Sequence, residues 1–563
     1  MTLDEAKAVL CAPGAPFEMV DVAAHGRQFR AWKNVPANLR VLAQIGRSHG
    51  TREFLIYEDE RVTFDGWFRA VAALAQHLRD CGVGRGDRVA LAMRNLPEWP
   101  VAFFAVTTLG AICVPLNAWW TGGELAYGLN TAGCCMLIAD EQRLDRIAPL
   151  RGQLPALTHV LGARLTQPID GVVPLESVIG TPHDYASLPD RDMPVAEIAA
   201  DDDATIFYTS GTTGHPKGAL GTHRNLATNI LSGAWVAACA VLRAGQPMPP
   251  PAPRTALVSV PLFHVTACSA VLMGSVFAGN TLVFMRRWDA GAALALIERE
   301  RINLAGGVPT IAWQLLEHPD REKYDLSSLE TVSYGGAPSA PDLVRKIAGV
   351  FGAGPGNGWG MTETMATVTN IVGDDYLDHP DSCGRPVAVA DLRVVCPERL
   401  VDLAPGEVGE LWASGPMVVK GYWNNPQATA ETFVDGWVRT GDLARIDAEG
   451  YCHIVDRAKD IVIRGGENIY SGEVENALYD HPAVMDAAVI GIPHHTLGEE
   501  PAAVVHLAPG GEASEADLRA WVGERLAAFK VPVAIRFLPE TLPRNANGKI
   551  LKRDLKALFD QST

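Results

Sequence analysis

Short apolar runs alternate with helix-length patterns along most of the chain, and this alternation restricts the possible folds more than any other feature. The apolar run 88–93 follows a helical pattern at 66–80, and the apolar run 111–116 follows another at 99–109. Strands that alternate with helices build layered α/β structures with largely parallel sheets. The sequence therefore predicts an α/β fold with stacked sheets. Further runs of the same kind occupy residues 256–260, 280–284 and 329–334.

The pattern changes toward the C-terminus. Between residues 384 and 455, short apolar runs are separated by Gly and Pro, which predicts a β-rich subdomain. The chain has 563 residues, more than one hydrophobic core usually supports. We therefore expect a large domain over 1–456 and a small α+β domain over 457–563. The small domain should contain helices at 471–481 and 515–528 and strands at 486–490 and 502–507, and the Pro-rich tract 246–253 should be an exposed excursion of the large domain.

A loop rich in glycine and hydroxyl groups follows the apolar run 204–207. Glycines let backbone N–H groups approach an oxyanion closely, and hydroxyls and a lysine ammonium add donors and positive charge. Because Lys217 is followed by Gly218, the loop departs from the G-x-x-x-x-G-K-[ST] phosphate loop. It predicts a polyphosphate site for ATP. The loop reads Tyr208-Thr209-Ser210-Gly211-Thr212-Thr213-Gly214-His215-Pro216-Lys217-Gly218.

Later segments carry side chains that suit a nucleotide. The ring of Trp359 offers a π-face, and the hard carboxylate of Glu363 suits a hard cation. Asp442 offers two acceptor oxygens and no donor, as a diol requires. Each segment alone resembles an ordinary turn, so the order in which they occur carries the prediction. The segments are 333–338 (SYGGAP), 358–364 (GWGMTET), 440–442 (TGD), 456–460 (DRAKD) and 543–549 (PRNANGK).

Together with the loop at 208–218, these segments resemble the adenylate-forming superfamily of acyl-CoA synthetases, peptide-synthetase adenylation domains and firefly luciferase. The chain is most similar to bacterial fatty-acid–CoA ligases, and the resemblance covers residues 55–555. It implies a large N-terminal domain and a mobile C-terminal lid with a hinge near Lys459. It also implies an AMP-forming acyl-CoA synthetase. The acid and ATP would give acyl-AMP and pyrophosphate, and CoA would then give acyl-CoA and AMP.

The resemblance also implies roles for individual residues. Thr362 would contact the α-phosphate and Glu363 would help to hold Mg²⁺, while Lys549 would neutralise charge on the reacting oxygens during adenylation. Asp442 would accept hydrogen bonds from the ribose hydroxyls, and Arg457 would contact ribose or phosphate. The other expected nucleotide and CoA positions are Thr209, Ser210, Gly211, Thr212, Thr213, Gly214 and Lys217 at the phosphates, Gly335, Gly336, Ala337, Trp359 and Gly360 at adenine, and Gly465 and Gly466 along a pantetheine tunnel.

The segment 261–265 (PLFHV) resembles the one that lines the acyl pocket of the superfamily, where His264 would act as an aromatic gate. Relatives that activate amino acids carry an Asp at this position for the substrate ammonium, so His264 disfavours an amino acid. The alternative for His264 is a packed histidine without substrate contact. We expect a medium- or long-chain fatty acid. Aryl, alicyclic and steroid side-chain acids stay open, because an apolar lining formed by Val265, Ala267, Ala270 and Met273 does not distinguish them.

Composition excludes several other classes of protein. The net charge of −17 argues against nucleic acid as a main partner, because phosphate backbones are bound by clustered Lys and Arg. Ten scattered cysteines show neither a zinc spacing nor a disulfide framework. No signal peptide and no uninterrupted membrane span is apparent. We expect a cytoplasmic enzyme with a carboxylic acid and CoA as partners, with loose membrane contact left open. Oligomeric state is not predicted.

Three further functions are compatible with parts of the pattern. An acyl-AMP ligase that loads a carrier protein would share every nucleotide motif, and CoA dependence would separate it. A luciferase-like oxygenase would share the first half-reaction, and oxygen uptake or light would reveal it. A catalytically inactive ATP-binding module would lack one of Lys549, Glu363 or Asp442, and all three are present.

Overall fold

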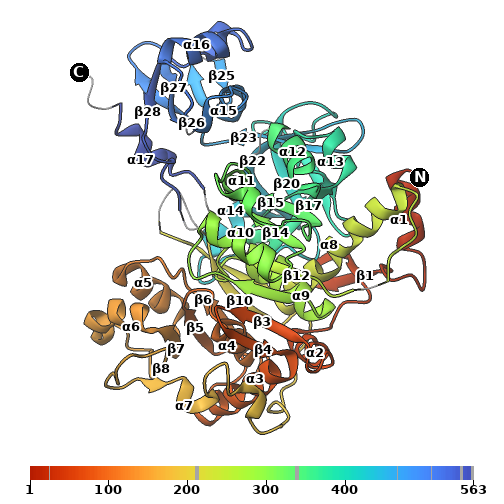
Figure 1. Cartoon of the computed structure of the whole chain (residues 1–563), viewed down its shortest axis with the longest axis vertical. Coiled ribbons are helices and arrows are strands. Elements are labelled where there is room, and N and C mark those ends of the chain that lie inside the picture. The colour runs from red at the N-terminus through yellow and green to blue at the C-terminus, as the bar shows by residue number, and fades with distance from the viewer. Residues whose placement is uncertain are drawn as a thin grey trace.

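The chain folds into a large α/β domain and a smaller C-terminal domain, as Figure 1 shows. The computed structural model describes residues 1–24, 26–209, 215–250, 252–336, 341–465, 467–508, 510–545 and 549–559. A hairpin of β1 (Met19–Ala24) and β2 (Arg27–Trp32) follows helix α1 (Leu3–Leu10). Helix α1 packs on the long helix α8 (His223–Arg243) of the large domain.

The first large sheet has seven strands, and its strands are parallel except for the antiparallel edge pair β10–β11. Its order is β11 (Gly218–Thr222), β10 (Asp203–Tyr208), β6 (Ile112–Pro115), β5 (Arg88–Ala92), β7 (Met136–Asp140), β8 (His159–Ala163) and β9 (Val173–Pro174). The glycine–hydroxyl loop thus connects the two strands of the edge hairpin.

The second large sheet has nine strands with a parallel centre and antiparallel pairs at both edges. Because the parallel strands β12, β14, β15 and β16 run side by side, their C-terminal ends meet along one edge, where ligands of α/β proteins usually bind. The order is β18 (Arg385–Pro386), β17 (Ala366–Val372), β16 (Gly354–Met361), β15 (Thr331–Gly335), β14 (Leu304–Gly307), β12 (Thr255–Val258), β13 (Thr281–Phe284), β3 (Glu53–Tyr57) and β4 (Glu60–Thr63).

Helices form three layers around the two sheets. The central layer shares one hydrophobic core with both sheets and contains α2 (Leu39–Arg47), α3 (Phe64–Asp80), α4 (Glu98–Thr107), α8 and α9 (Met273–Ala278). The other face of the first sheet is covered by α5 (Gly122–Ala132) and α6 (Glu141–Ile147). The other face of the second sheet is covered by α10 (Ala290–Arg299), α11 (Pro309–Leu316) and α12 (Pro341–Lys346). Short helices are α7 (Glu176–Ile179), α13 (Asp374–Asp378) and α14 (Pro426–Thr432).

The β-rich subdomain predicted over 384–455 is present as an antiparallel five-stranded sheet with its own small core. Its strands are β19 (Asp391–Val395), β20 (Gly409–Ser414), β21 (Phe433–Val434), β22 (Trp437–Ile446) and β23 (Cys452–Arg457).

The C-terminal domain, which we call the lid, has separate hydrophobic cores around one five-stranded sheet. In Figure 1 the segment around α17 extends from the lid toward the large domain. The lid strands are β24 (Val462–Arg464), β25 (Glu467–Ile469), β26 (Val484–His494), β27 (Gly498–Leu507) and β28 (Ala534–Phe537), and its helices are α15 (Ser471–Tyr479), α16 (Glu515–Gly523) and α17 (Lys552–Lys556).

The predicted α/β class is confirmed, and most predicted elements are found within two residues of their expected ends. The largest error concerns α16, which ends at Gly523 although the pattern predicted a helix to Ala528. Glycine is a poor helix former, so the helix stops there and a 3₁₀ turn over Ala528–Lys530 follows. The hinge near Lys459 stays a prediction.

Helix α8 is the one helix in the described part of the chain with the length and apolar composition of a membrane span. Within this structure 67% of its most apolar window is buried. Polar side chains on α8 make buried hydrogen bonds, as when Asn229 Nδ2 donates to the Met365 carbonyl over 2.7 Å. These features are those of a core helix of the large domain.

Candidate active site

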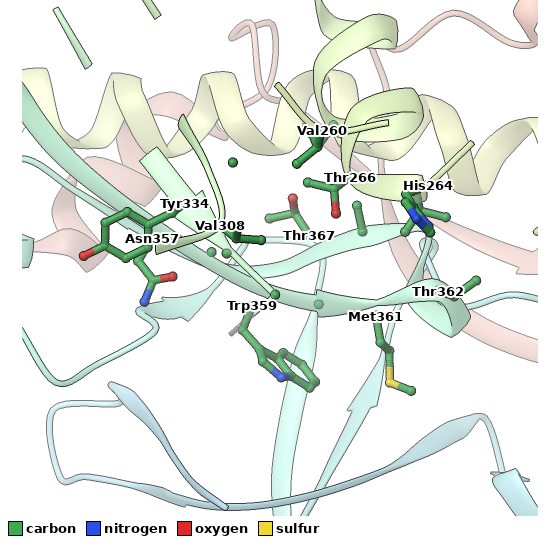
Figure 2. A pocket seen from close by; sticks show the side chains of 18 of the residues that line it. Val260, His264, Thr266, Val308, Tyr334, Asn357, Trp359, Met361, Thr362 and Thr367 are labelled. Atoms are coloured by element: carbon green, nitrogen blue, oxygen red, sulfur yellow. The ribbon is translucent and has the colours of Figure 1, made fainter. Parts of the chain in front are cut away.

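A cavity of about 3420 Å³ brings together most of the predicted site residues. It opens where the C-terminal ends of β12, β14, β15 and β16 face the lid. Figure 2 shows Val260, Thr266 and His264 on one side of the β16 ribbon and Trp359 on the other. The lining also includes Thr209, Lys217, Gly335, Gly336, Gly360, Thr362, Glu363, Asp442, Arg457 and Lys549.

The two ends of the glycine–hydroxyl loop are held together at the cavity. The Thr209 N–H donates to the Lys217 carbonyl over 2.8 Å, and the Lys217 N–H donates to Thr209 Oγ1 over 3.3 Å. The hydroxyl of Tyr127 donates to the Pro216 carbonyl over 3.2 Å, and its ring stacks on His215. This closure keeps Lys217 in the cavity wall. The predicted positions Ser210, Gly211, Thr212, Thr213 and Gly214 lie outside the described residues, as do Ala337 and Gly466.

Glu363 lies in a one-turn helix directly after β16 and is 6% exposed. The hydroxyl of Tyr422 donates to Glu363 Oε1 over 2.6 Å. The ammonium of Lys217 lies 4.9 Å from the centre of the Tyr422 ring. Burial raises the pKa of Glu363, and the hydrogen bond from Tyr422 opposes this rise. Tyr422 therefore connects the predicted metal ligand to the glycine–hydroxyl loop.

Sequence reasoning missed Tyr422, because its partner Glu363 is 59 residues away. Its backbone is fixed against the first sheet by an antiparallel bridge to Ala219, and the Trp423 N–H donates to the Gly218 carbonyl over 2.7 Å. The local signal, a Gly-Tyr pair before Asn-Asn-Pro, indicates only a turn.

Trp359 and Asp442 form a hydrogen bond in the part of the cavity predicted for the nucleoside. The indole Nε1 of Trp359 donates to Asp442 Oδ2 over 2.9 Å, and Arg457 Nε lies 3.5 Å from Asp442 Oδ1. Burial raises the pKa of Asp442, whereas Arg457 and the indole favour its charged form. The structure therefore brings the three predicted nucleoside residues into direct contact.

Glycines keep the wall between β14, β15 and β16 thin. A Cβ atom on Gly335 would lie 2.5 Å from the Gly358 carbonyl oxygen. Gly306, which sequence reasoning missed, has φ +148°, and a Cβ there would lie 1.6 Å from the Ser333 carbonyl oxygen. Only glycine is compatible with such close approach of two strands. The signal for this wall was the pair Gly306-Gly307 at the end of an apolar run.

His264 ends a turn in which its N–H donates to the Pro261 carbonyl over 3.1 Å, and the π-helical segment Thr266–Leu272 begins two residues later. Its ring packs against Phe263 with centroids 4.5 Å apart, and its Nε2 atom is buried without a hydrogen-bond partner among the described residues. Burial lowers the pKa of His264 to about 3, so the imidazole is neutral near pH 7. The side chain of Asn95 fixes this loop, donating to the Val260 carbonyl and accepting from the Leu262 N–H.

Part of the cavity lining, which we call the apolar branch, comes from two neighbouring helical elements. On one side are residues of α8, and on the other residues of the π-helical segment and α9. Glycine and alanine are frequent among these lining residues, so the side chains at this wall are short. The lining residues are Ile230, Gly233, Ala234, Ala237, Ala238 and Val241 on α8 and Ala270, Val271, Gly274, Phe277 and Ala278 on the other element, and Met248, Pro249 and Pro250 line the same cavity.

The residues present fit a magnesium ion that is held mainly by a substrate. No group of three or more His, Cys, Asp and Glu side chains that could hold a metal occurs within the described ranges. Mg²⁺ usually binds one or two carboxylates together with substrate phosphates and water, so a single buried carboxylate beside a phosphate loop is sufficient. Glu363 is that carboxylate.

Family comparisons agree with this geometry. The model of the AMP-binding enzyme family matches residues 42–423, and the model of the AMP-binding enzyme C-terminal domain matches residues 473–549. The chain belongs to the AMP-binding enzyme family. The predicted superfamily is therefore confirmed, and so is the predicted class of AMP-forming acyl-CoA synthetase.

Several relatives of this AMP-binding enzyme are known. It is 37% identical over 498 residues to a feruloyl-CoA synthase of Amycolatopsis sp, covering 88% of this chain and 94% of the relative. It is 34% identical over 520 residues to a long-chain-fatty-acid–CoA ligase of Bacillus subtilis (strain 168), covering 88% of this chain and 90% of the relative. Among solved structures, the anthranilate CoA ligase AuaEII with anthranoyl-AMP matches with a TM-score of 0.82, 26% identity and coverage of 93% and 98%. The Bacillus subtilis o-succinylbenzoate CoA synthetase with ATP and magnesium matches with a TM-score of 0.75 and 30% identity, covering 92% of this chain and 98% of that structure.

The lid of this AMP-binding enzyme presents Lys549, and not Gly465, to the cavity. Lys549 and its neighbours Arg544, Asn545 and Lys552 line the cavity. Gly465 is not part of the lining, and Ile463 in the same hairpin is 54% exposed. The expected adenylation residue is thus near the other site residues in this pose, while the expected tunnel residue lies apart from them.

Proposed function

We propose that this AMP-binding enzyme joins a medium- or long-chain fatty acid to CoA through an acyl-AMP intermediate. The apolar branch is the observation that carries the proposal. Its α8 wall extends from Ile230 to Val241, eleven residues or about 16 Å of helix. This length exceeds one aromatic ring and suits an extended hydrocarbon chain. Each buried methylene would contribute about 0.8 kcal/mol to binding.

The first half-reaction would use residues of both domains. A carboxylate oxygen of the acid attacks the α-phosphorus of ATP, and the bond to pyrophosphate breaks. Lys217 would bind the leaving phosphates, while the Thr362 hydroxyl and the Lys549 ammonium would stabilise negative charge on the reacting oxygens. Glu363 would hold Mg²⁺, which neutralises phosphate charge when bound. Neutral His264 would stand between the reacting carboxylate and the apolar branch.

The second half-reaction would transfer the acyl group to CoA. The thiol sulfur attacks the acyl carbon, AMP leaves and the thiol proton is released. A patch of arginine and aromatic side chains beside the cavity supports CoA, a thiol that carries a nucleotide, as the acyl acceptor. The guanidinium of Arg94 lies 5.1 Å from the centre of the Trp119 ring, and Trp119 is 45% exposed and lines the cavity. Burial lowers the pKa of Arg94 to about 10, and nearby Arg143, Arg287 and Arg146 add to this effect. In a chain of net charge −17, such clustered cations favour phosphate groups.

An aryl acid is the second candidate. Similarity to a feruloyl-CoA synthase and to an anthranilate CoA ligase favours it. The ring pair Phe263–His264 beside the cavity would also offer an aromatic acid a stacking surface. Alicyclic and steroid acids would fit the same lining, and a carrier protein could replace CoA as acceptor.

A pyrophosphate-release screen tests the proposal. Purified enzyme with MgATP receives saturated fatty acids of increasing length, cinnamic and benzoic acids, steroid acids and amino acids, each with and without CoA. We expect the highest kcat/KM with medium- or long-chain fatty acids and acyl-CoA formation only when CoA is present. A preference for aryl acids would support the second candidate. Activity with amino acids alone, or none with any acid, would contradict the proposed function.

A further inference from the structure

Two ion pairs flank the segment that carries Lys549. Before it, Arg544 Nη2 lies 2.6 Å from Asp486 Oδ1 on β26, and the Asp486 side chain is 3% exposed. After it, Lys552 Nζ lies 2.7 Å from Glu475 Oε1 on α15, and the Glu475 side chain is 12% exposed. Both carboxylates belong to the folded body of the lid. The Lys549 segment is therefore attached to the lid at both of its ends.

Backbone contacts transmit the position of these two attachments to Lys549. The Lys549 N–H donates to Asn545 Oδ1 over 3.0 Å, and the Asn545 N–H donates to the Lys549 carbonyl over 2.9 Å. The Leu551 N–H donates to the Pro543 carbonyl over 2.8 Å, which closes the segment next to Lys552. A shift of Lys552 would therefore move the strand-like base on which Lys549 is mounted.

Lys552 also lies in a polar network that reaches the large domain. Its Nζ donates to Ser471 Oγ over 2.6 Å, and that hydroxyl donates to Asp456 Oδ1 over 3.1 Å. The Ser471 N–H donates to the same Asp456 carboxylate. Asp456 belongs to β23 and directly precedes Arg457, the neighbour of Asp442. The network thus extends from the base of the Lys549 segment to the predicted ribose-binding carboxylate.

The charges of this network leave Lys552 little freedom to act on a substrate itself. Its ammonium pairs directly with Glu475 and reaches Asp456 through the Ser471 hydroxyl, and Ser471 and Asp456 are buried. An ammonium that balances two carboxylates in this way is a poor partner for a phosphate, because moving it away would leave two buried negative charges uncompensated. A role through Lys549 fits these contacts better than direct contact with ATP.

We propose that Lys552 is a positioning residue that holds Lys549 in the cavity for the adenylation half-reaction. The inference rests on the proposed function, in which Lys549 stabilises charge on the reacting oxygens. Displacement of a catalytic group by about 1 Å can cost up to about 100-fold in rate. Loss of Lys552 should therefore slow adenylation specifically and leave reactions that do not need Lys549 intact.

The experiment compares Lys552→Met with Lys530→Met in the full-length enzyme. Lys530 is the control because its Nζ also pairs with a glutamate of α15, Glu473, over 2.6 Å, whereas neither Lys530 nor Glu473 lines the cavity. Adenylation is measured by pyrophosphate exchange into ATP, and thioester formation is measured from synthetic acyl-AMP and CoA. We expect Lys552→Met to lower adenylation on the order of 10- to 100-fold, to leave thioester formation within about 2-fold, and Lys530→Met to change neither.

A double mutant separates positioning from a general structural role. If Lys552 acts through Lys549, then Lys552→Met should cause little additional loss of adenylation in a Lys549→Ala background. Lys552→Arg should restore part of the rate, because it keeps the charge beside Glu475. The pair Lys552→Met with Glu475→Gln removes both charges, so it tests the proposal if the single variant leaves Glu475 unpaired and the lid unfolds.

Each outcome can be assigned. The inference would be overturned if Lys552→Met, alone and combined with Glu475→Gln, slowed both half-reactions equally. It would also be overturned if the adenylation losses of Lys552→Met and Lys549→Ala multiplied in the variant that carries both changes. If none of the acids offered supported pyrophosphate exchange by the wild-type enzyme, the proposed function would instead be overturned. In that case the inference falls with it, and the two failures are distinguished by the wild-type measurement.

Discussion

Two carboxylates of the site each accept a hydrogen bond that stabilises the charged form. Glu363 is buried and Asp442 is partly buried, and each accepts a hydrogen bond from an aromatic side chain, Tyr422 or Trp359. A buried carboxylate without partners is costly, so these donors stabilise the charged forms that a metal ion or a ribose diol would need. The aromatic residues also present their rings to a cation or a base. Two residue-scale predictions follow from such contacts.

Replacing Trp359 by Phe should weaken ATP binding without removing the ring that could stack on adenine. The change deletes the Nε1–H donor that fixes Asp442, so the carboxylate is less well placed for its predicted hydrogen bonds to the ribose hydroxyls, and hydrogen bonds to a charged group contribute about 1.5–3 kcal/mol. We expect the Kd for ATP, measured by titration calorimetry, to rise on the order of 10-fold. Trp288→Phe is the control, since it loses an indole bond to Gln314 away from the cavity. Equal effects of the two changes would contradict the prediction.

His453 on β23 should make stability depend on pH. Burial by itself would lower its pKa, but hydrogen bonds to Asp381 over 3.1 Å and Asp447 over 3.0 Å raise it overall against the opposing charge of Arg445. A raised histidine pKa stabilises the fold fully below the unfolded value of about 6.5, and this contribution is lost as pH rises through the folded pKa. The pKa values of Asp381 and Asp447 are lowered, so their contribution is lost as the solution is acidified below about pH 4.

The thermal midpoint of His453→Gln should therefore fall furthest below that of the wild type between about pH 5 and 6.5, and the gap should narrow toward about pH 9. Scanning calorimetry of both proteins across this range checks the prediction. A gap that stays constant with pH would contradict it.

At the scale of elements, helix α8 and the π-helical segment with α9 determine the length of the apolar branch. The lining residues of both elements include several glycines and alanines, whose short side chains occupy little of the cavity. The wider turn of a π-helical segment often occurs at functional sites, and here it begins two residues after His264. Sequence periodicity predicted strands on either side of the π-helical segment, at 256–260 and 280–284, but it predicted neither α8 nor the helical segment that faces it.

Gly274→Leu should shorten the branch. A Cβ atom at Gly274 meets nothing within 4 Å, so the new side chain would extend into open space beside α8. We expect kcat/KM for long-chain acids to fall about 10-fold or more, while short and aryl acids keep their rates, because only the outer part of the branch is filled. Gly152→Leu is the control, since it also meets nothing within 4 Å and lies outside the cavity. Equal losses for all acids would contradict a fatty-acid branch.

At the scale of the whole molecule, the site exists only because separate folding units meet. The glycine–hydroxyl loop joins two strands of the first sheet, and Trp359 and Glu363 come from β16 of the second sheet and the turn after it. Asp442 comes from the β-rich subdomain, and Lys549 comes from the lid. Assembly from separate units is compatible with a site that closes when one unit moves, and the movement of the lid stays a prediction. The lid pose described here combines Lys549 with the cavity and leaves Gly465 outside.

The amino-acid sequence by itself determined the α/β class, the β-rich subdomain and the chemical groups of the site, because helix and strand periodicity and turn chemistry are local properties. Tertiary structure alone decided that Trp359 would donate to Asp442, 83 residues away, and that Tyr422 would hold Glu363. It also decided that Lys552 would pair with Glu475 and that α8 and the helical segment that faces it would line one cavity. Those contacts depend on how sheets and helices pack together, and packing joins residues whose separation along the chain carries no local signal.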